Sequence, residues 1–308
     1  MSAVIEARNL SRWYGHVLGI SEFSLEIQPG ITALLGPNGA GKSTFMKIIT
    51  GQLKANIGEA RIFEEKVWNN RRIFHRLGFC PEVDAFYEEL TGLEFLSGLL
   101  SLYGFSQSES RKRAEQTLEL VELYDVRNRL IRSYSRGMRQ RVKIAQAIAH
   151  DPEVLILDEP LNGLDPLSKR RIIRLIKDYK AAGRTIVVSS HVLPEVEAMT
   201  SEIVLIHQGK ILARGDIYFI RELLDTHPHM IRIKSQSFRQ LAQILAAEDI
   251  ILNISFAPEE QAVIFETHHR DKFFNRLNDL ILQTDLRIDE VNSPDDNLQA
   301  VFDYLVGK

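Results

Sequence analysis

An eight-residue phosphate-binding pattern constrains the fold of this chain more than any other feature. The run from Gly36 to Ser43 reads GPNGAGKS and matches G-x-x-x-x-G-K-[ST] at every fixed position. The apolar run Ile31–Leu35 before it predicts a buried strand, and residues 44–50 after it predict a helix. Glycines let such a loop curl so that successive backbone N–H groups point inward, where the helix N-terminus adds partial positive charge. The pattern therefore predicts a strand–loop–helix unit that binds the phosphates of a nucleoside triphosphate.

Two side chains of the loop are expected to contact the ligand in addition to the backbone N–H groups. Lys42 would reach the β- and γ-phosphates as a point charge, and the hydroxyl of Ser43 would bind Mg²⁺. The alternative is a glycine-rich turn without a ligand, which the flanking strand and helix patterns disfavour. The candidate nucleotide-binding residues are Gly36, Pro37, Asn38, Gly39, Ala40, Gly41, Lys42, Ser43 and Thr44.

An acidic pair follows a second buried strand. The run Val154–Leu157 ends in Asp158 and Glu159, and ligands of open α/β sheets gather at the carboxyl ends of the strands. Asp158 is placed to hold Mg²⁺, and Glu159 is placed to polarise an attacking water molecule. The alternative is a solvated acidic turn, which becomes less favoured because the phosphate loop is in the same chain.

Further apolar runs predict a mainly parallel sheet covered by helices on both faces. Predicted strands are 4–7, 24–27, 185–189 and 203–206, and a helix is predicted over 169–182. Residues from about 84 to 150 differ, because helical periodicity dominates there, as in 108–124 and 137–149. We expect an α/β core with an inserted helical subdomain.

Composition excludes several classes of protein. The 308 residues carry 38 basic and 41 acidic side chains, a net charge of −3, which gives no argument for a polyanion-binding protein. Cys80 is the single cysteine and cannot form an internal disulfide, which fits a reducing compartment. The longest uncharged stretch, Ile27–Gly41, has fifteen residues and falls short of the ~20 that a bilayer span needs. We expect no secretory signal, and membrane contact only through a partner.

Beyond these shared NTPase motifs, the chain resembles the ATP-binding subunits of ABC (ATP-binding cassette) transporters over residues 3–225. The specific evidence is Ser135-Arg136-Gly137-Met138, which resembles the family's signature and precedes a basic helix. The segment Leu161–Pro166, with Asp165, resembles the dimer-contact loop. His191 matches the switch histidine, and Tyr14 matches the aromatic residue that stacks on adenine.

The resemblance implies a P-loop NTPase cassette whose two copies sandwich two ATP molecules. Ser135 and the N–H of Gly137 would contact the γ-phosphate held by the other subunit, and His191 would help to orient the attacking water. Taken alone, Tyr14 would be a strand-edge aromatic and His191 a helix-cap residue. The basic residues Arg139, Arg141 and Lys143 would be a solvated helix face. These residues occur together in the order that the family has, which favours the family interpretation over these separate ones.

Two departures from the family pattern stand out. Arg136 replaces the usual glycine and Met138 the usual glutamine, although Ser135 and Gly137 remain. We interpret this form as a mark of a subgroup of exporter ATPases. Glu82 stands where the family has a glutamine that touches Mg²⁺ and links the core to the helical subdomain. We predict that Glu82 keeps this linking role but alters the affinity of the site for the metal.

The resemblance also implies partners. A transmembrane permease subunit would dock on the segment 84–105, whose apolar residues would form a surface, the alternative being core packing within the helical subdomain. These residues are Phe86, Leu90, Leu93, Phe95 and Leu96. A second ATP-binding subunit, identical or different, would complete the ATP sites. The implied location is peripheral, on the cytoplasmic side of the inner membrane.

The C-terminal residues form a separate, acidic unit. Residues 1–230 carry 30 basic and 28 acidic groups, whereas 231–308 carry 8 and 13. We place the junction near residue 226, which gives a cassette over 1–225 and an accessory domain over 226–308. The predicted order β-α-β-β-α-β over 230–291 indicates a ferredoxin-like α+β sandwich, followed by a helix that includes Leu298 and Leu305. The adjacent pair His268-His269 is not expected to bind a metal.

Two other functions compete with an exporter ATPase. A soluble ABC ATPase acting on ribosomes or DNA would generally carry two cassettes, and a nucleic-acid ligand would need a basic stripe. A regulatory module without catalysis conflicts with the intact Lys42, Asp158, Glu159 and His191. The sequence therefore predicts an ATPase subunit that uses ATP and Mg²⁺ to power membrane export. The cargo is left open, as is the choice between homodimer and heterodimer.

Overall fold

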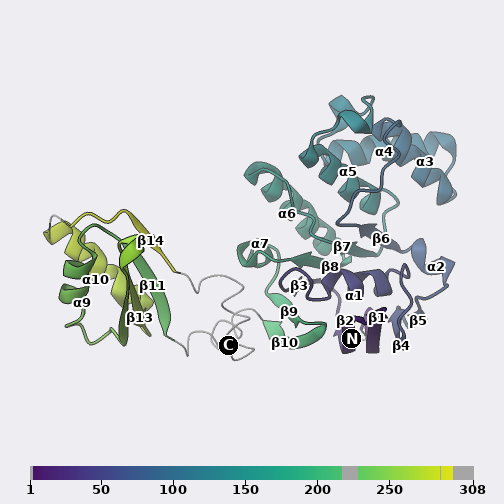
Figure 1. Cartoon of the computed structure of the whole chain (residues 1–308). Coiled ribbons are helices and arrows are strands. Elements are labelled where there is room, and N and C mark those ends of the chain that lie inside the picture. Colours follow the sequence, from purple (N-terminus) through teal and green to yellow (C-terminus); the bar gives the residue numbers. More distant parts are fainter. Residues whose placement is uncertain (1–2, 217–227, 285, 294–308) are drawn as a thin grey trace. The chain divides into compact units, whose positions relative to one another are not determined.

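The computed structural model of the chain describes residues 3–216, 228–284 and 286–293. The chain divides into two compact units, residues 1–215 and 216–308 (Figure 1). The junction predicted near residue 226 lies among residues 217–227, outside the described part. Each unit has its own apolar core.

A six-stranded sheet forms the centre of the first unit, in the order β10-β9-β3-β8-β7-β6. The strand pairs from β9 through β3, β8 and β7 to β6 are parallel, and β7 and β8 are buried along their whole length. This confirms the predicted α/β class. The strands are β3 (Ile31–Leu35), β6 (Leu77–Cys80), β7 (Val154–Leu157), β8 (Thr185–Ser190), β9 (Glu202–His207) and β10 (Lys210–Asp216).

A second, antiparallel sheet was only partly predicted. It has the order β2-β1-β4-β5, with strands β1 (Ile5–Tyr14), β2 (Val17–Ile27), β4 (Ile57–Ile62) and β5 (Glu65–Lys66). The sequence indicated only residues 4–7 and 24–27, because register shifts interrupt the apolar alternation farther along β1 and β2. Asn9 and Glu22 take positive φ at these irregularities.

Helix α1 (Lys42–Ile49) joins the two sheets. Its side chains Phe45, Met46 and Ile49 are fully buried, and the ring of Phe45 packs on that of Phe23 from β2 at 4.6 Å. The position of the phosphate loop, at the start of this helix, is thus set by the core. The other helices of the α/β part are α2 (Arg71–Phe74), α6 (Pro166–Ala181) and α7 (Leu193–Glu197).

The helical subdomain is confirmed between β6 and β7. It contains α3 (Gly92–Leu102), α4 (Gln107–Leu120) and α5 (Arg136–Ile148), which lie together in Figure 1. Each helix has a hydroxyl N-cap, and Thr91 forms a reciprocal capping box with Glu94. These caps explain why the helices begin where they do.

The C-terminal unit has the predicted β-α-β-β-α-β order. Its antiparallel sheet runs β12-β13-β11-β14. The elements are β11 (His229–Lys234), α9 (Phe238–Leu245), β12 (Asn253–Ala257), β13 (Ala262–Thr267), α10 (Arg270–Gln283) and β14 (Glu290–Asn292). The last strand is shorter than expected, since only residues 290–292 pair with β11. The helix predicted at residues 298–305 lies outside the described residues.

Within the described residues, no helix is both long and apolar enough to cross a bilayer.

Candidate nucleotide-binding and catalytic site

Two glycines of the phosphate loop stand where no side chain fits. A Cβ atom on Gly36 would lie 2.3 Å from the carbonyl oxygen of Ile206, and one on Gly41 would lie 2.7 Å from that of Gly19. Gly41 also has a φ of 108°, in the left-handed region that glycine favours. The loop is thus held tightly between β3 and α1, with its backbone close to neighbouring strands.

Lys42 is buried beneath the loop. Its Nζ donates to the carbonyl oxygens of Gly36 at 2.6 Å and Pro37 at 3.2 Å, and lies 3.7 Å from Oε1 of Glu159. Burial lowers the pKa of Lys42, while the carboxylates of Glu159, Asp158 and Glu82 act in the opposite direction. These contacts hold the ammonium group at the inner wall of the loop.

The acidic pair is positioned by one serine of the neighbouring strand. Ser189, in β8, donates its hydroxyl to Asp158 at 2.6 Å and accepts the backbone N–H of Glu159 at 2.8 Å. Glu159 has a φ of 49°, which is rare for a residue with a side chain and is typical of strain kept at functional sites. Sequence reasoning assigned no role to Ser189.

The carboxylate of Glu159 lies between two other predicted site residues, Lys42 and His191. Its Oε2 lies 3.0 Å from Nδ1 of His191, and its Oε1 faces Lys42. Glu159 is only 7% exposed, and its Oε1 is buried without a hydrogen-bond partner in the described structure. A buried carboxylate oxygen with unused hydrogen-bonding capacity is suited to accept a proton.

A pocket of about 300 Å³ lies over the loop. It brings together Tyr14, the loop residues 38–44, Glu82 and Glu159. The N–H groups of the glycine-rich loop and the ammonium group of Lys42 fit a polyphosphate, and the carboxylate of Glu159 borders the same pocket. In the described ranges no three His, Cys, Asp or Glu side chains form a metal cluster, so a Mg²⁺ ion here would need ligands from the phosphates as well.

Tyr14 forms one end of this pocket. Its hydroxyl lies 3.4 Å from that of Thr44, and its side chain packs against Gly19, where an added Cβ would come within 2.9 Å of the ring. The guanidinium group of Arg12 stands 5.4 Å from the ring centroid. Tyr14 is 45% exposed, which leaves ring surface for a planar ligand.

The signature residues lie apart from this pocket. Ser135 caps helix α5 and accepts the N–H of Met138 at 3.3 Å, but residues 135–138 are not among those that line the pocket. Arg136 donates to Asn162 at 2.8 Å and lies against Gly163. Within one chain, the signature therefore contacts the loop after the acidic pair rather than the phosphate loop.

Helix α5 is tied to the site by two side chains to which the sequence alone assigned no such role. Gln140 is 5% exposed and donates to the carbonyl oxygens of Glu159 at 3.2 Å and Pro160 at 2.9 Å. Lys143 is 3% exposed and donates to the carbonyl oxygen of Glu82 at 2.6 Å. The sequence signal that could have identified them is the spacing of these two polar side chains, one turn apart on an otherwise apolar face of the helix.

The basic residues of α5 do not form a simple solvated face. Arg139 pairs with Asp84 at 2.7 Å and Glu88 at 2.6 Å, and Lys143 pairs with Asp84 at 3.1 Å. These ion pairs hold the segment after Glu82 against α5. Glu82 therefore lies where the pocket and the helical subdomain meet.

The remaining predicted residues have local structural roles as well. Asp165 caps helix α6, since its carboxylate accepts the N–H groups of Leu167 and Ser168. The hydroxyl of Ser168, which also donates to this carboxylate, lowers the pKa of Asp165 most, and the backbone N–H bonds lower it further. In the apolar set of the segment 84–105, Leu93, Phe95 and Leu96 are buried, as the core-packing interpretation expects, because helices α3 and α4 pack there. The exposed apolar residues are Val83, Tyr87 and Leu102.

Comparisons with known proteins agree with this geometry. Residues 20–162 match the ABC transporter family. The chain is 32% identical over 313 residues to the bacitracin transport ATP-binding protein BcrA of Enterococcus faecalis, covering 100% of this chain and 97% of the relative. It is 40% identical over 204 residues to an uncharacterized ABC transporter ATP-binding protein of Nostoc sp., covering 65% of this chain. That match spans 61% of the relative's own length.

Solved structures give the same result. An ATP-binding subunit of an ABC transporter superposes with a TM-score of 0.66 at 30% identity, covering 72% of this chain and 93% of that one. A dimeric bacterial ABC transporter cassette superposes with a TM-score of 0.65 at 27% identity, covering 69% and 98%. The order of motifs, the geometry of the phosphate loop and these likenesses together show that the chain belongs to the ABC transporter family, as one of its ATP-binding proteins.

Proposed function

We propose that the chain binds and hydrolyses ATP and thereby powers a membrane ABC transporter that exports its cargo. The observation that carries this proposal is the buried Glu159 carboxylate, held between Lys42 and His191 at the phosphate loop. Similarity to a bacitracin transport ATP-binding protein over the full chain supports export as the direction.

The side chains suggest how the hydrolytic step proceeds. Glu159 accepts the proton of the water that attacks the γ-phosphate, and His191 holds the carboxylate in place and contacts the γ-phosphate. Lys42 and the loop N–H groups neutralise the charge on the phosphates. Ser43, Glu82 and Asp158 would hold Mg²⁺, which supplies further charge neutralisation when bound. Tyr14 offers its exposed ring surface to adenine.

Two chains are needed for a complete site. The signature residues Ser135–Met138 do not line the pocket of their own chain, so we place them against the γ-phosphate of a second ATP-binding subunit. The N-terminus of α5 offers the hydroxyl of Ser135 and the N–H group of Gly137 for that contact. Asp165 lies in the loop that would meet the partner cassette.

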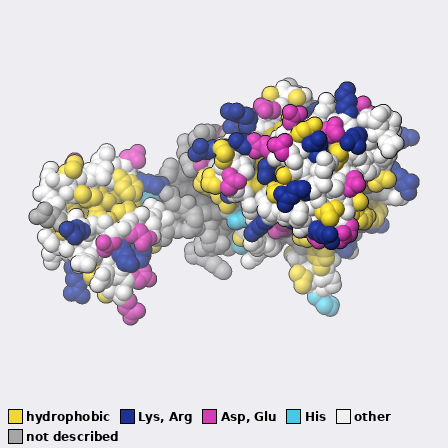
Figure 2. Space-filling view, turned by 90° about the horizontal axis from the view of Figure 1, so that it is seen from above, with side chains coloured by type: hydrophobic (Ala, Val, Ile, Leu, Met, Phe, Trp, Pro, Cys, Tyr) yellow, Lys and Arg dark blue, Asp and Glu magenta, His cyan; other side chains and the backbone are white. Residues whose placement is uncertain are grey.

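A transmembrane permease subunit is the proposed membrane partner. Val83 directly follows Glu82, Tyr87 lies a few residues farther along, and they are 74% and 73% exposed. A helix of the permease docked there would sense the state of the ATP site. The cassette would then be peripheral, on the cytoplasmic side of the inner membrane. The proposal includes no nucleic-acid ligand: basic and acidic side chains are interspersed on the face of the cassette in Figure 2, without a basic stripe.

Substitution of Glu159 tests the proposal. Glu159→Gln keeps the shape of the side chain but removes the proton acceptor, so hydrolysis should fall by 10² or more while ATP-dependent dimerisation persists. Lys42→Ala should lose ATP binding. Glu202→Gln, an exposed position at the start of β9, is the matched control and should keep full activity. Wild-type phosphate release from Glu159→Gln would refute the assigned base.

A further inference from the structure

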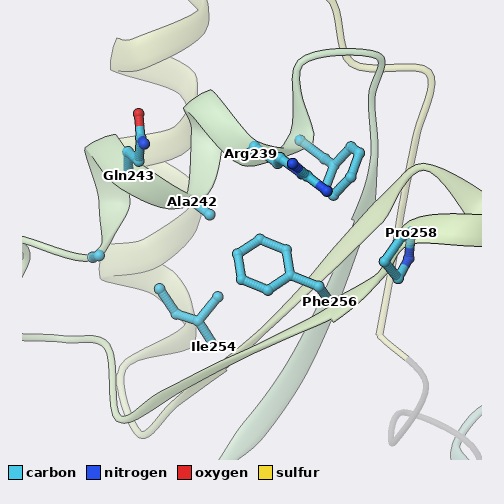
Figure 3. A pocket seen from close by; sticks show the side chains of 8 residues that line it. Arg239, Ala242, Gln243, Ile254, Phe256 and Pro258 are labelled. Carbon is cyan, nitrogen blue, oxygen red and sulfur yellow. The ribbon is translucent and has the colours of Figure 1, made fainter.

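The C-terminal unit contains a pocket of about 550 Å³ that is separate from the ATP site. It lies between helix α9 and strand β12, and Figure 3 shows Ala242 on the helix facing Phe256 and Ile254 on the strand. The residues that matter for its chemistry are Phe238, Arg239, Ala242, Ala246, Ile254 and Phe256. The volume lies within the range of small-molecule sites in proteins.

Small side chains on α9 create this space. Leu241, Ala242 and Leu245 belong to the core of the unit. Ala242 and the C-cap residue Ala246, one helical turn apart, line the pocket with small side chains. Opposite them, Phe256 leaves 51% of its surface exposed and meets the ring of Phe238 edge-on at 6.1 Å. Exposed aromatic surface next to a hollow is stabilised when an apolar group covers it.

One positive charge borders the pocket. The guanidinium group of Arg239 stands 5.8 Å from the ring centroid of Phe238, and no carboxylate among the described residues forms an ion pair with it. Two other arginines of the unit are paired: Arg232 contacts Glu260, and Arg276 lies 2.6 Å from Glu248. The apolar hollow therefore has a cation with free hydrogen-bond donors at one end.

We propose that this pocket binds a small amphipathic anion, that is, an apolar body carrying one carboxylate, sulfonate or phosphate group. The body would lie between Ala246 and Phe256, and the anionic group would receive the two parallel N–H bonds that a guanidinium group offers. The site is built wholly from residues of the C-terminal unit, so the proposal does not depend on the ATPase chemistry.

The test uses two fluorescent probes that differ in one charge. 8-Anilinonaphthalene-1-sulfonate has the apolar body and the anionic group, and N-phenyl-1-naphthylamine has the same body without the sulfonate. Both are titrated into the full chain. Arg239→Gln should weaken binding of the sulfonate about tenfold, the size of one charge-assisted hydrogen bond. It should leave binding of the neutral probe within about twofold. Arg287→Gln, an exposed arginine of the same unit, is the charge control.

A second variant removes the space instead of the charge. Ala246→Trp fills the pocket and should abolish the binding component that depends on Arg239, whereas Ala247→Trp, the neighbouring exposed position, should not. These matched pairs matter because apolar side chains also gather on the face of this unit seen in Figure 2 and can bind the probes. Equal sulfonate binding by Arg239→Gln and Arg287→Gln would overturn the proposal. The proposal would also be overturned if Ala246→Trp changed the self-association of the chain but left the Arg239-dependent binding of the sulfonate intact.

Discussion

At the scale of single residues, the site depends on a few buried polar contacts rather than on the motif letters alone. Ser189 and Gln140 orient the backbone around Glu159, and Lys143 fixes the backbone at Glu82. A charged group in such surroundings interacts more strongly than in water because the local dielectric constant is low. Small changes of charge in this region should therefore have measurable effects on the activity of the site.

Glu82 provides the first residue-scale prediction. Glu82→Gln removes one negative charge from the pocket wall, so the Mg²⁺ concentration needed for half-maximal hydrolysis should change by several-fold. Hydrolysis is measured against Mg²⁺ at fixed ATP. Glu202→Gln, which alters an exposed carboxylate at the start of β9, is the control. Identical Mg²⁺ curves and rates for wild type and Glu82→Gln would show that this position has no metal-related role.

His150 provides a prediction about pH. Its ring stacks on Tyr103 at 4.1 Å, its Nε2 lies 3.1 Å from the carbonyl oxygen of Leu77, and burial lowers its pKa to about 4. The unfolded chain takes up a proton near pH 6.5, which the folded chain does not. The free energy of unfolding therefore keeps its full value above pH 6.5 and falls by about 3 kcal/mol as the pH decreases from 6.5 to 4.

The two tryptophans, Trp13 and Trp68, both lie in the first unit, so their fluorescence reports its unfolding by urea. His150→Gln should lose less stability than wild type between pH 6.5 and 4, although it starts lower at pH 7. His16→Gln, an exposed histidine, should keep the wild-type pH dependence. If His150→Gln and wild type lose the same free energy on acidification, His150 is not the titrating group.

At the scale of elements, the N-terminus of α5 combines a structural and a functional role. Ser135 caps the helix, and the same end of the helix would contact phosphate. Ser135→Ala should cost about 1 kcal/mol and reduce ATPase activity. Ser135→Asp restores a good cap but places a carboxylate against the expected phosphate, so stability should recover while ATPase activity stays low.

Tryptophan-monitored unfolding and phosphate release separate these two effects. Ser106, which caps α4 away from the pocket, supplies the control pair: Ser106→Asp should keep both stability and activity. An active Ser135→Asp enzyme would argue that the N-terminus of α5 meets no phosphate.

At the scale of the whole molecule, the two units have separate cores. Phe273 is fully buried in the C-terminal unit, and its ring packs on that of Phe265 at 5.3 Å. Phe273→Ala should destabilise that unit by about 3–5 kcal/mol. The tryptophan transition of the first unit and its ATP affinity should stay unchanged, because no core residue is shared.

Amide hydrogen exchange on the full chain would locate the effect, with faster exchange expected over residues 228–284 only. Ile281→Ala, at a 39% exposed position of α10, should have a small effect there. Loss of ATP affinity in Phe273→Ala would instead indicate that the two units are energetically coupled.

The predictable parts were those with strong local signals. Continuous apolar runs specified β3, β7, β8 and β9, because strands buried on both faces need apolar side chains throughout. The strands of the antiparallel sheet were underestimated, because bulges at Asn9 and Glu22 interrupt their alternation. For Leu93, Phe95 and Leu96 the sequence left a docking surface and core packing both open, because periodicity alone cannot tell a docking face from a core face. The structure shows that they are core residues.

The sequence by itself determined the phosphate loop, the acidic pair, the family, the buried parallel strands β3, β7, β8 and β9, and the order of elements in the C-terminal unit, because each is encoded in residues close together along the chain. Only the tertiary structure decided what surrounds them: that Ser189 and Gln140 position Glu159, that Lys143 is buried at Glu82, and that α9 leaves a hollow opposite Phe256. These contacts join residues far apart in sequence, and only packing brings them within hydrogen-bonding distance.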